Sequence, residues 1–183
     1  LSNKLFRSSY VSVLNVVINT IVSFIFGIYI AKLIGPESYG NVAMIGVVHQ
    51  LAIVIVVSGL GQSIIRTRIL TDLDYSTVFL FNIVLGIFIY ILIYALAPYL
   101  AGLYGEATLS QLLRVTGLLA ISSAISTVPS AILTREYRFV SIAGASTFSN
   151  LIGLSIGLYL AIKGYNEWAL VAQMVIASYL GAG

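Results

Sequence analysis

Residues 8–31 read SSYVSVLNVVINTIVSFIFGIYIA and contain no Asp, Glu, Lys or Arg. A helix needs about 20 mostly apolar residues to cross the hydrocarbon core of a bilayer, so this stretch is long enough to span one. Further runs without these charged residues cover 38–65, 75–105, 115–134 and 139–162, and another begins at residue 168. The sequence therefore predicts an all-α integral membrane protein with six membrane-crossing helices.

The composition excludes a soluble domain. Hydrophobic residues make up 60% of the chain, charged residues 8%, and the mean hydropathy is +1.06, far from the values typical of soluble proteins. The net charge of +3 would suggest nucleic acid in a soluble protein. Here the basic residues flank apolar runs, where they anchor helices and set their orientation. We therefore expect no nucleic-acid partner, and the runs are too long for barrel strands.

Local signals divide the apolar runs into separate helices. Gly35-Pro36 is typical of a turn, and Thr71 to Asp74 resembles a capping box at the start of the third helix. Pro98 is expected to end or bend that helix near its exit. The expected helices cover 9–32, 39–65, 76–100, 109–130, 141–162 and the chain from 168 onward.

Lysine and arginine are distributed unequally between the two ends of these helices. One end carries six of them, Lys4, Arg7, Arg66, Arg68, Arg135 and Arg138, and the other end carries Lys32, Arg114 and Lys163. Loops rich in Lys and Arg stay in the cytoplasm. The count therefore predicts a cytoplasmic N-terminus.

Small and polar residues recur at intervals of three or four along three of the predicted helices, which places them on one face of each. These stripes are Ser8, Ser12, Asn15, Asn19, Ser23 and Gly27; Asn82, Gly86, Tyr90 and Tyr94; and Ser146, Asn150, Gly153 and Gly157. One explanation is tight helix packing, in which Gly153 and Gly157 form a GxxxG motif. The other is a shared polar pathway, and it makes Asn15, Asn19, Asn82 and Asn150 candidate substrate-binding residues.

His49 is the one ionisable side chain deep inside a predicted span. Such a residue is costly in hydrocarbon and is a functional candidate by default. The alternative is a neutral imidazole that bonds a neighbouring helix.

The six acidic residues all lie in predicted loops or at span ends; they are Glu37, Asp72, Asp74, Glu106, Glu136 and Glu167. An intramembrane aspartyl protease or a metal-dependent enzyme needs paired acids or a histidine cluster. The sequence therefore predicts no enzyme, no catalytic residues, no cofactor and no metal site.

Residues 31–40, AKLIGPESYG, resemble the A(R/K)LLGPExYG turn after the first helix of polysaccharide and O-antigen exporters. Five more matches follow in the same order: GLGQSIIR at 59–66, STVF at 76–79 with Asn82, AP at 97–98 with YGE at 104–106, LLRV at 112–115 and VPSAIL at 128–133. Together they cover most of the chain. By this resemblance the chain is identified as a member of the polysaccharide transporter, or O-antigen flippase, branch of the multidrug/oligosaccharidyl-lipid/polysaccharide superfamily.

The resemblance implies a MATE-like flippase with two lobes of six helices each. Residues 1–183 are similar to the N-terminal lobe, and because the chain starts at Leu and stops inside the sixth apolar run, we expect a piece that is truncated in the sixth helix and lacks the C-terminal lobe. Some drug-exporting relatives use an acidic residue in the first helix for ion coupling. This chain has Asn15 and Asn19 there, which disfavours that mechanism.

The resemblance also implies a function without covalent chemistry. A lipid-linked oligosaccharide, typically on undecaprenyl diphosphate, would move from the cytoplasmic to the outer leaflet of the bacterial inner membrane by alternating access, for cell-surface polysaccharide synthesis. The implied partners are this substrate, membrane lipids and the polysaccharide polymerase machinery.

A diphosphate headgroup needs cationic partners, and arginine offers several donors in a fixed fork. Arg7, Arg66 and Arg68 lie near the predicted cytoplasmic mouth. Arg66 is the strongest candidate because it lies in the matched segment 59–66. Ordinary anchoring at the membrane surface is the alternative for each of the three.

Two other functions stay open from the sequence. One is a multidrug exporter of the same superfamily. The other is a membrane subunit that transports nothing and packs against other proteins of a cell-envelope assembly.

Overall fold

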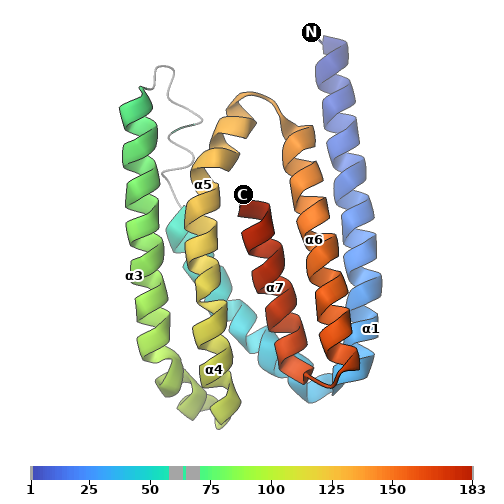
Figure 1. The fold of residues 1–183 in the computed structure, drawn as a ribbon, viewed down its shortest axis with the longest axis vertical. Coiled ribbons are helices and arrows are strands. Elements are labelled where there is room, and N and C mark those ends of the chain that lie inside the picture. The colour runs from blue at the N-terminus through green and yellow to red at the C-terminus, as the bar shows by residue number, and fades with distance from the viewer. Residues whose placement is uncertain (1, 58–63, 65–70, 183) are drawn as a thin grey trace.

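The computed structural model describes residues 2–57, 64 and 71–182, and their side chains from residue 13 onward apart from residue 72. Its helices are α1 (Ser2–Val57), α3 (Asp72–Tyr104), α4 (Ala107–Thr116), α5 (Leu118–Arg135), α6 (Phe139–Ile162) and α7 (Asn166–Ala182). Figure 1 shows that most of them run along one long axis, as in a bundle. The predicted all-α class is confirmed for the described residues.

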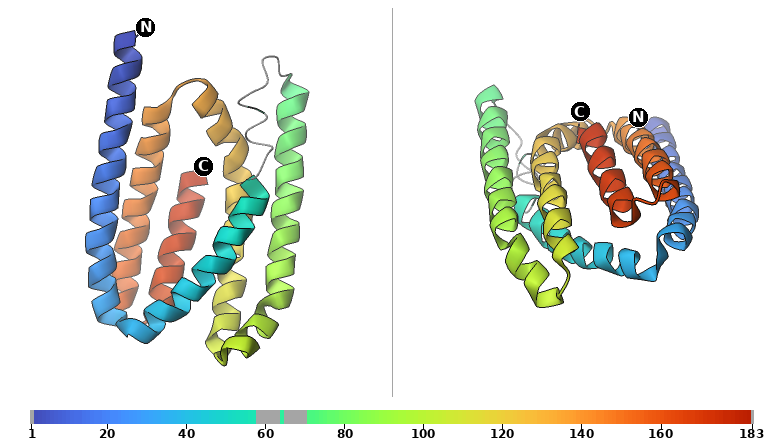
Figure 2. Two further views of the ribbon diagram at one scale, coloured as in Figure 1. Left: turned by 180° about the vertical axis from the view of Figure 1, so that it is seen from behind. Right: turned by 60° about the horizontal axis from the view of Figure 1, so that its bottom comes forward.

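Helix α1 reverses its direction at Gly35. The backbone of Gly35 adopts φ 82° and ψ 165°, which is not helical, and Pro36 follows it directly. Proline suits this place because its fixed φ starts a helix and the first turn needs no N–H. Figure 2 shows the two halves diverging from the reversal, and we call them the first arm (2–34) and the second arm (36–57).

The sequence predicted two helices here, 9–32 and 39–65, with a connection of several residues between them. That connection is wrong, since helix continues on both sides of Gly35. The end of the predicted second helix, apart from Ile64, lies outside the described residues.

The predicted helix 109–130 is two helices, so the expectation of a single helix is wrong. Helices α4 and α5 meet at Gly117, and α5 continues past Pro129 to Arg135. A Cβ on Gly117 would lie 3.1 Å from Cδ2 of Tyr90 and 3.3 Å from Cγ2 of Ile93, both on α3. The missing side chain lets α3 approach closely at this break.

Two sequence signals lie at the ends of α3. The capping box is present: the side chain of Thr71 accepts from the backbone N–H of Asp74, and that of Asp74 accepts from the N–H of Thr71. Pro98 does not end α3, which continues to Tyr104 and stops at Gly105 in a left-handed conformation. Figure 1 shows the lower end of α3 turning towards α4.

Helices α6 and α7 pack through the predicted GxxxG motif. A Cβ on Gly153 would lie 2.7 Å from the carbonyl oxygen of Gln173, and one on Gly157 would lie 2.9 Å from Cβ of Gln173. Both distances are too short for real side chains. The packing explanation is therefore confirmed for this pair of glycines, which lets the two backbones approach.

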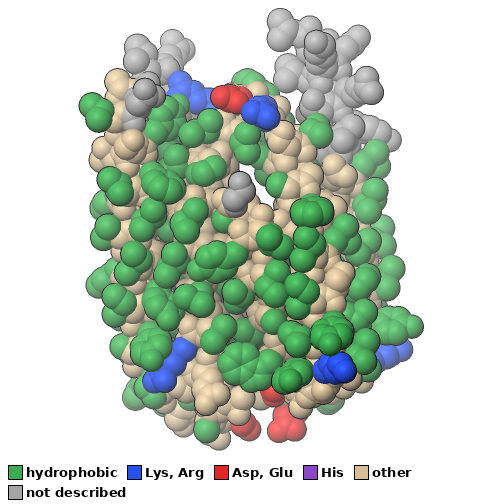
Figure 3. All heavy atoms as spheres, viewed as in Figure 1, with side chains coloured by type: hydrophobic (Ala, Val, Ile, Leu, Met, Phe, Trp, Pro, Cys, Tyr) green, Lys and Arg blue, Asp and Glu red, His purple; other side chains and the backbone are tan. Residues whose placement is uncertain are grey.

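Among the described residues, four stretches are long and apolar enough to cross a membrane: Val13–Val57, Leu73–Tyr104, Ala107–Arg135 and Phe139–Ile162. Figure 3 shows hydrophobic side chains over the middle of one face and charged side chains at its two ends. Arg135 ends α5 at one end of the bundle, and Lys163 follows α6 at the other. The chain is thus built as a multi-pass membrane protein.

Candidate functional site

The polar stripe of the first arm meets that of α6 in an interhelical cluster. The side-chain nitrogen Nδ2 of Asn150 donates to Oδ1 of Asn19 and to Oγ of Ser23, each at 2.7 Å. All three residues are half-buried. The cluster joins α1 to α6 and uses both amide hydrogens of Asn150, so it contributes to helix packing whatever else it does.

Replacing Asn150 by leucine should therefore destabilise the fold. Hydrogen bonds between membrane helices contribute about 0.6 kcal/mol on average and about 1.7 at most, so the loss of two predicts about 1–3 kcal/mol. Thermal unfolding of the detergent-purified protein measures this loss, and a double-mutant cycle with Asn19→Ala isolates one of the two contacts.

Ser155→Ala is the matched control on α6, because the exposed Ser155 hydroxyl donates only to the carbonyl of Leu151 in its own helix. An Asn150→Leu protein as stable as this control would show that the cluster contributes nothing.

A cavity lies where the two arms of α1 diverge around α7, and Figure 2 shows α7 between them. Its volume is about 280 Å³, and we call it the arm cavity. Its wall includes the polar side chains of Ser23, Tyr39 and Gln173, together with Gly27, Gly46 and Met174. The cavity therefore adjoins the Asn150 cluster through Ser23, which belongs to both.

A second hollow, of about 340 Å³, lies between α5, α6 and α7 and contains several serines and Asn150. The hydroxyls of three of these serines already form hydrogen bonds. Ser126 and Ser146 donate to carbonyls of their own helices, and Ser178 donates to Ser122 at 2.8 Å. The hydroxyl hydrogens of these three serines are therefore already used within the protein.

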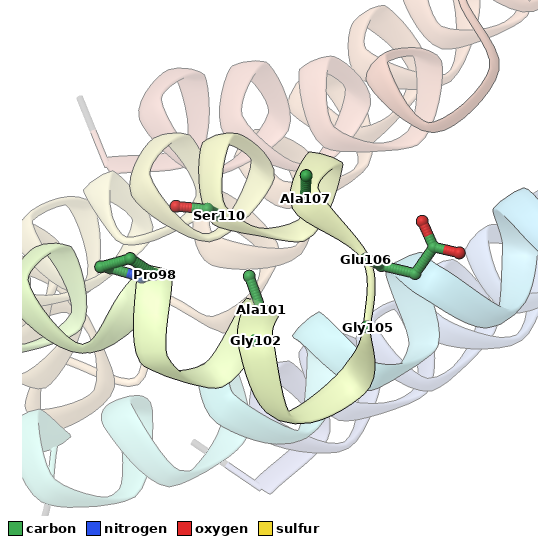
Figure 4. Close-up of a pocket in the computed structure, with 7 residues that line it drawn as sticks. All are labelled: Pro98, Ala101, Gly102, Gly105, Glu106, Ala107 and Ser110. Carbon is green, nitrogen blue, oxygen red and sulfur yellow. The ribbon is translucent and has the colours of Figure 1, made fainter.

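A third hollow, of about 440 Å³, lies at the turn between α3 and α4. Pro98, Gly102, Glu106 and Ser110 line part of it, and Glu106 is the one charged residue in its wall. Figure 4 shows the Glu106 carboxylate pointing away from Pro98 and Ser110. Polar groups do not converge here as they do in the arm cavity.

Asn82 lies away from the other predicted site residues. It is fully buried in α3, one turn before Gly86, where a Cβ would meet Ala124 of α5 at 2.7 Å. Among the described residues neither its Oδ1 nor its Nδ2 has a hydrogen-bond partner. The structure thus brings Asn19 and Asn150 together, whereas Asn82 lies on α3 near the contact of that helix with α5.

The substrate-binding roles of the other predicted site residues stay predictions. Asn15 is half-buried in the first arm, and His49 is half-buried in the second. The described part of the chain provides no hydrogen bond to the His49 ring. Arg66, Arg68 and the side chain of Arg7 lie outside the described residues.

Two residues of the arm cavity were missed from the sequence. Gln173 had a signal, since it is the one amide side chain in the apolar run that begins at residue 168. Tyr39 lies in the matched segment 31–40, but nothing in that segment indicated that its side chain lines a cavity. Among the side chains that the structure describes, no group of three His, Asp or Glu could hold a metal ion.

Residues 29–182 match the family described as polysaccharide biosynthesis protein. The chain belongs to this polysaccharide biosynthesis protein family. The succinoglycan biosynthesis transport protein ExoT of Rhizobium meliloti (strain 1021) is 27% identical over 149 residues, which are 81% of this chain and 30% of that protein. The teichuronic acid biosynthesis protein TuaB of Bacillus subtilis (strain 168) is 28% identical over 117 residues, or 64% of this chain and 24% of that protein.

The chain therefore spans about a third or less of the length of these relatives. One of them is named a transport protein, and neither is named an enzyme. No solved structure matches this chain.

In this chain, the region that matches the family covers the Gly35 reversal and the helices after it. It includes Tyr39 and Gln173 of the arm cavity, and it begins after Asn19 and Ser23. The arm cavity is therefore formed partly by residues inside the matched region and partly by Ser23 and Gly27 of the first arm, which precede it.

Proposed function

We propose that the chain is the N-terminal, six-helix lobe of a two-lobe flippase that moves a lipid-linked oligosaccharide to the outer leaflet. The substrate is a saccharide repeat unit on a polyprenyl diphosphate such as undecaprenyl diphosphate, and it moves by alternating access. The family match over residues 29–182, together with the relative named a succinoglycan transport protein, carries this proposal.

The reversal at Gly35 supports the proposed number of helices. If each arm of α1 crosses the membrane, then the arms, α3, the pair α4 and α5, α6 and α7 make six crossings. In this proposal the remaining length of the relatives supplies the second lobe.

The proposed location is the bacterial inner membrane, with the N-terminus in the cytoplasm. The end of the bundle with Arg135 and Arg138 then faces the cytoplasm, and the end with Lys32 and Lys163 faces outward. The sequence predicts the same cytoplasmic side for Arg7, Arg66 and Arg68. Membrane lipids and the polysaccharide polymerase machinery are the proposed partners.

The experiment that tests this function follows lipid-linked repeat units in a deletion strain. We expect the deletion to trap them in the cytoplasmic leaflet and the restored gene to release them, as measured by access of an external sugar-modifying enzyme to spheroplasts. Normal outward movement in the deletion strain, with no redundant exporter, would refute the proposal.

We also expect Arg66→Gln to lower export at least tenfold with unchanged protein level, because the diphosphate loses a bidentate donor. The control is Arg138→Gln, since Arg138 is exposed and its guanidinium lies 3.8 Å from the Glu136 carboxylate. Export is measured as surface polysaccharide per cell. Equal export by the two variants would identify Arg66 as a membrane anchor.

A further inference from the structure

The polar side chains in the wall of the arm cavity have unused hydrogen-bonding capacity. Oγ of Ser23 accepts from Asn150 at 2.7 Å, and its hydrogen has no acceptor within the described part of the chain. Thr20, in the same arm, instead donates to the carbonyl of Val16 at 2.8 Å. Tyr39 is exposed, and its hydroxyl and the Gln173 amide likewise form no hydrogen bond with any described residue. Oε1 of Gln173 is buried beside Gly157 of α6.

Ser23 and Gln173 lie partly buried between helices of a membrane protein, where unpaired polar atoms are costly. The neighbouring hydrophobic side chains do not relieve that cost. A polar occupant of the arm cavity would, because it can accept from the amide hydrogens of Gln173 and from the hydroxyls of Ser23 and Tyr39.

The glycines in the cavity wall differ from the packing glycines. A Cβ on Gly153 or Gly157 would clash within 3 Å of α7. A Cβ on Gly27 or Gly46 would meet no atom within 4 Å. The absence of side chains at these two positions therefore leaves open space rather than a close helix contact.

We propose that the arm cavity binds one neutral sugar ring of the translocated saccharide, with Ser23, Tyr39 and Gln173 as its hydrogen-bonding partners. This assignment rests on the proposed function. A sugar ring carries hydroxyls that both donate and accept, and its faces of C–H groups suit an apolar wall such as that of Met174. The volume of about 280 Å³ is close to the lower end, about 300 Å³, of small-molecule sites.

The test uses the full-length protein in lipid nanodiscs and saturation-transfer difference NMR. The probes are free glucose and galactose in one set of samples, and hexyl glucoside in the other set. We expect ring-proton signals with the wild-type protein. We expect them to fall at least fivefold in Gly27→Leu, which fills the cavity, and in Gln173→Met, which keeps the length of the side chain but removes its amide.

The matched control is Gly144→Leu, because Gly144 on α6 is exposed, has open space around it and does not line the arm cavity. Each variant is first compared with the wild type by size-exclusion chromatography and thermal unfolding. Gly27→Leu and Gln173→Met test the cavity in separate ways, so misfolding of one leaves the other decisive.

Ring signals from both probes would assign binding to the sugar ring alone, and ring signals from hexyl glucoside alone would assign it to a lipid-linked sugar; both support the proposal. Signals from the hexyl chain only, no ring signal from the wild-type protein, or equal ring signals in Gly27→Leu and Gly144→Leu would overturn it. A protein that releases lipid-linked repeat units in the deletion strain but shows no ring signal would refute the sugar site and leave the proposed function standing.

Discussion

Replacing Gly35 by alanine is expected to lower the free energy of unfolding by about 1–3 kcal/mol and to reduce the yield of folded protein severalfold. The φ of 82° and ψ of 165° at Gly35 lie in a region that is essentially open to glycine alone. A side chain at residue 35 either strains the backbone at the reversal or widens the angle between the two arms. A wider angle at the reversal would move the first arm away from α6 and α7. Ile30 and Ile34 of this arm pack in a buried cluster with Ala161 of α6 and Ala169 of α7.

Thermal unfolding of the detergent-purified protein measures the loss of stability, and fluorescence-detected size-exclusion chromatography measures the yield of folded protein. Gly40→Ala is the matched control, because Gly40 lies in the same helix without a positive φ and a Cβ there meets nothing within 4 Å. We expect this control to be neutral or slightly stabilising. A Gly35→Ala protein as stable as Gly40→Ala would show that the reversal does not depend on glycine.

The double substitution Gly153→Ala and Gly157→Ala is expected to destabilise the pairing of α6 with α7 by about 1–3 kcal/mol. The new methyl groups would lie 2.7 Å from the carbonyl oxygen of Gln173 and 2.9 Å from its Cβ. Backbone atoms cannot rotate away as a flexible side chain can, so the helices must move apart. The separation would also reduce the other contacts along this helix pair.

Gly144→Ala on α6 is the control for this pair, since its Cβ meets no atom within 4 Å. Denaturant titration of the two proteins in the same detergent gives the difference in stability. If the double variant unfolds at the same denaturant concentration as Gly144→Ala, the close contact of α6 and α7 is not needed for stability.

Several features of the fold were predictable because each depends on a few neighbouring residues. Hydropathy identified the membrane-crossing stretches, Thr71 and Asp74 predicted the start of α3, and Gly35-Pro36 predicted the place where α1 reverses. The spacing of Gly153 and Gly157 predicted a packing face. In each case the signal was local, since it arises from the backbone preferences or the solvation of one segment.

The break at Gly117 was not predictable in the same way. The hydrophobic pattern continues through this residue, so the sequence suggested one helix from 109 to 130. The break lies where Tyr90 and Ile93 of α3 come close to Gly117. Such an approach between segments leaves no mark in the local pattern of either segment.

The sequence by itself determined that this is a membrane protein, where α3 starts and α1 reverses, and which faces carry small and polar residues. Hydration cost and backbone geometry act residue by residue, so those properties can be read along the chain. Only the tertiary structure decided that Asn150 bonds Asn19 and Ser23, that Asn82 lies apart from them, and that Gln173 and Tyr39 share a cavity. These are contacts between residues far apart in sequence, and they exist only once the helices have packed.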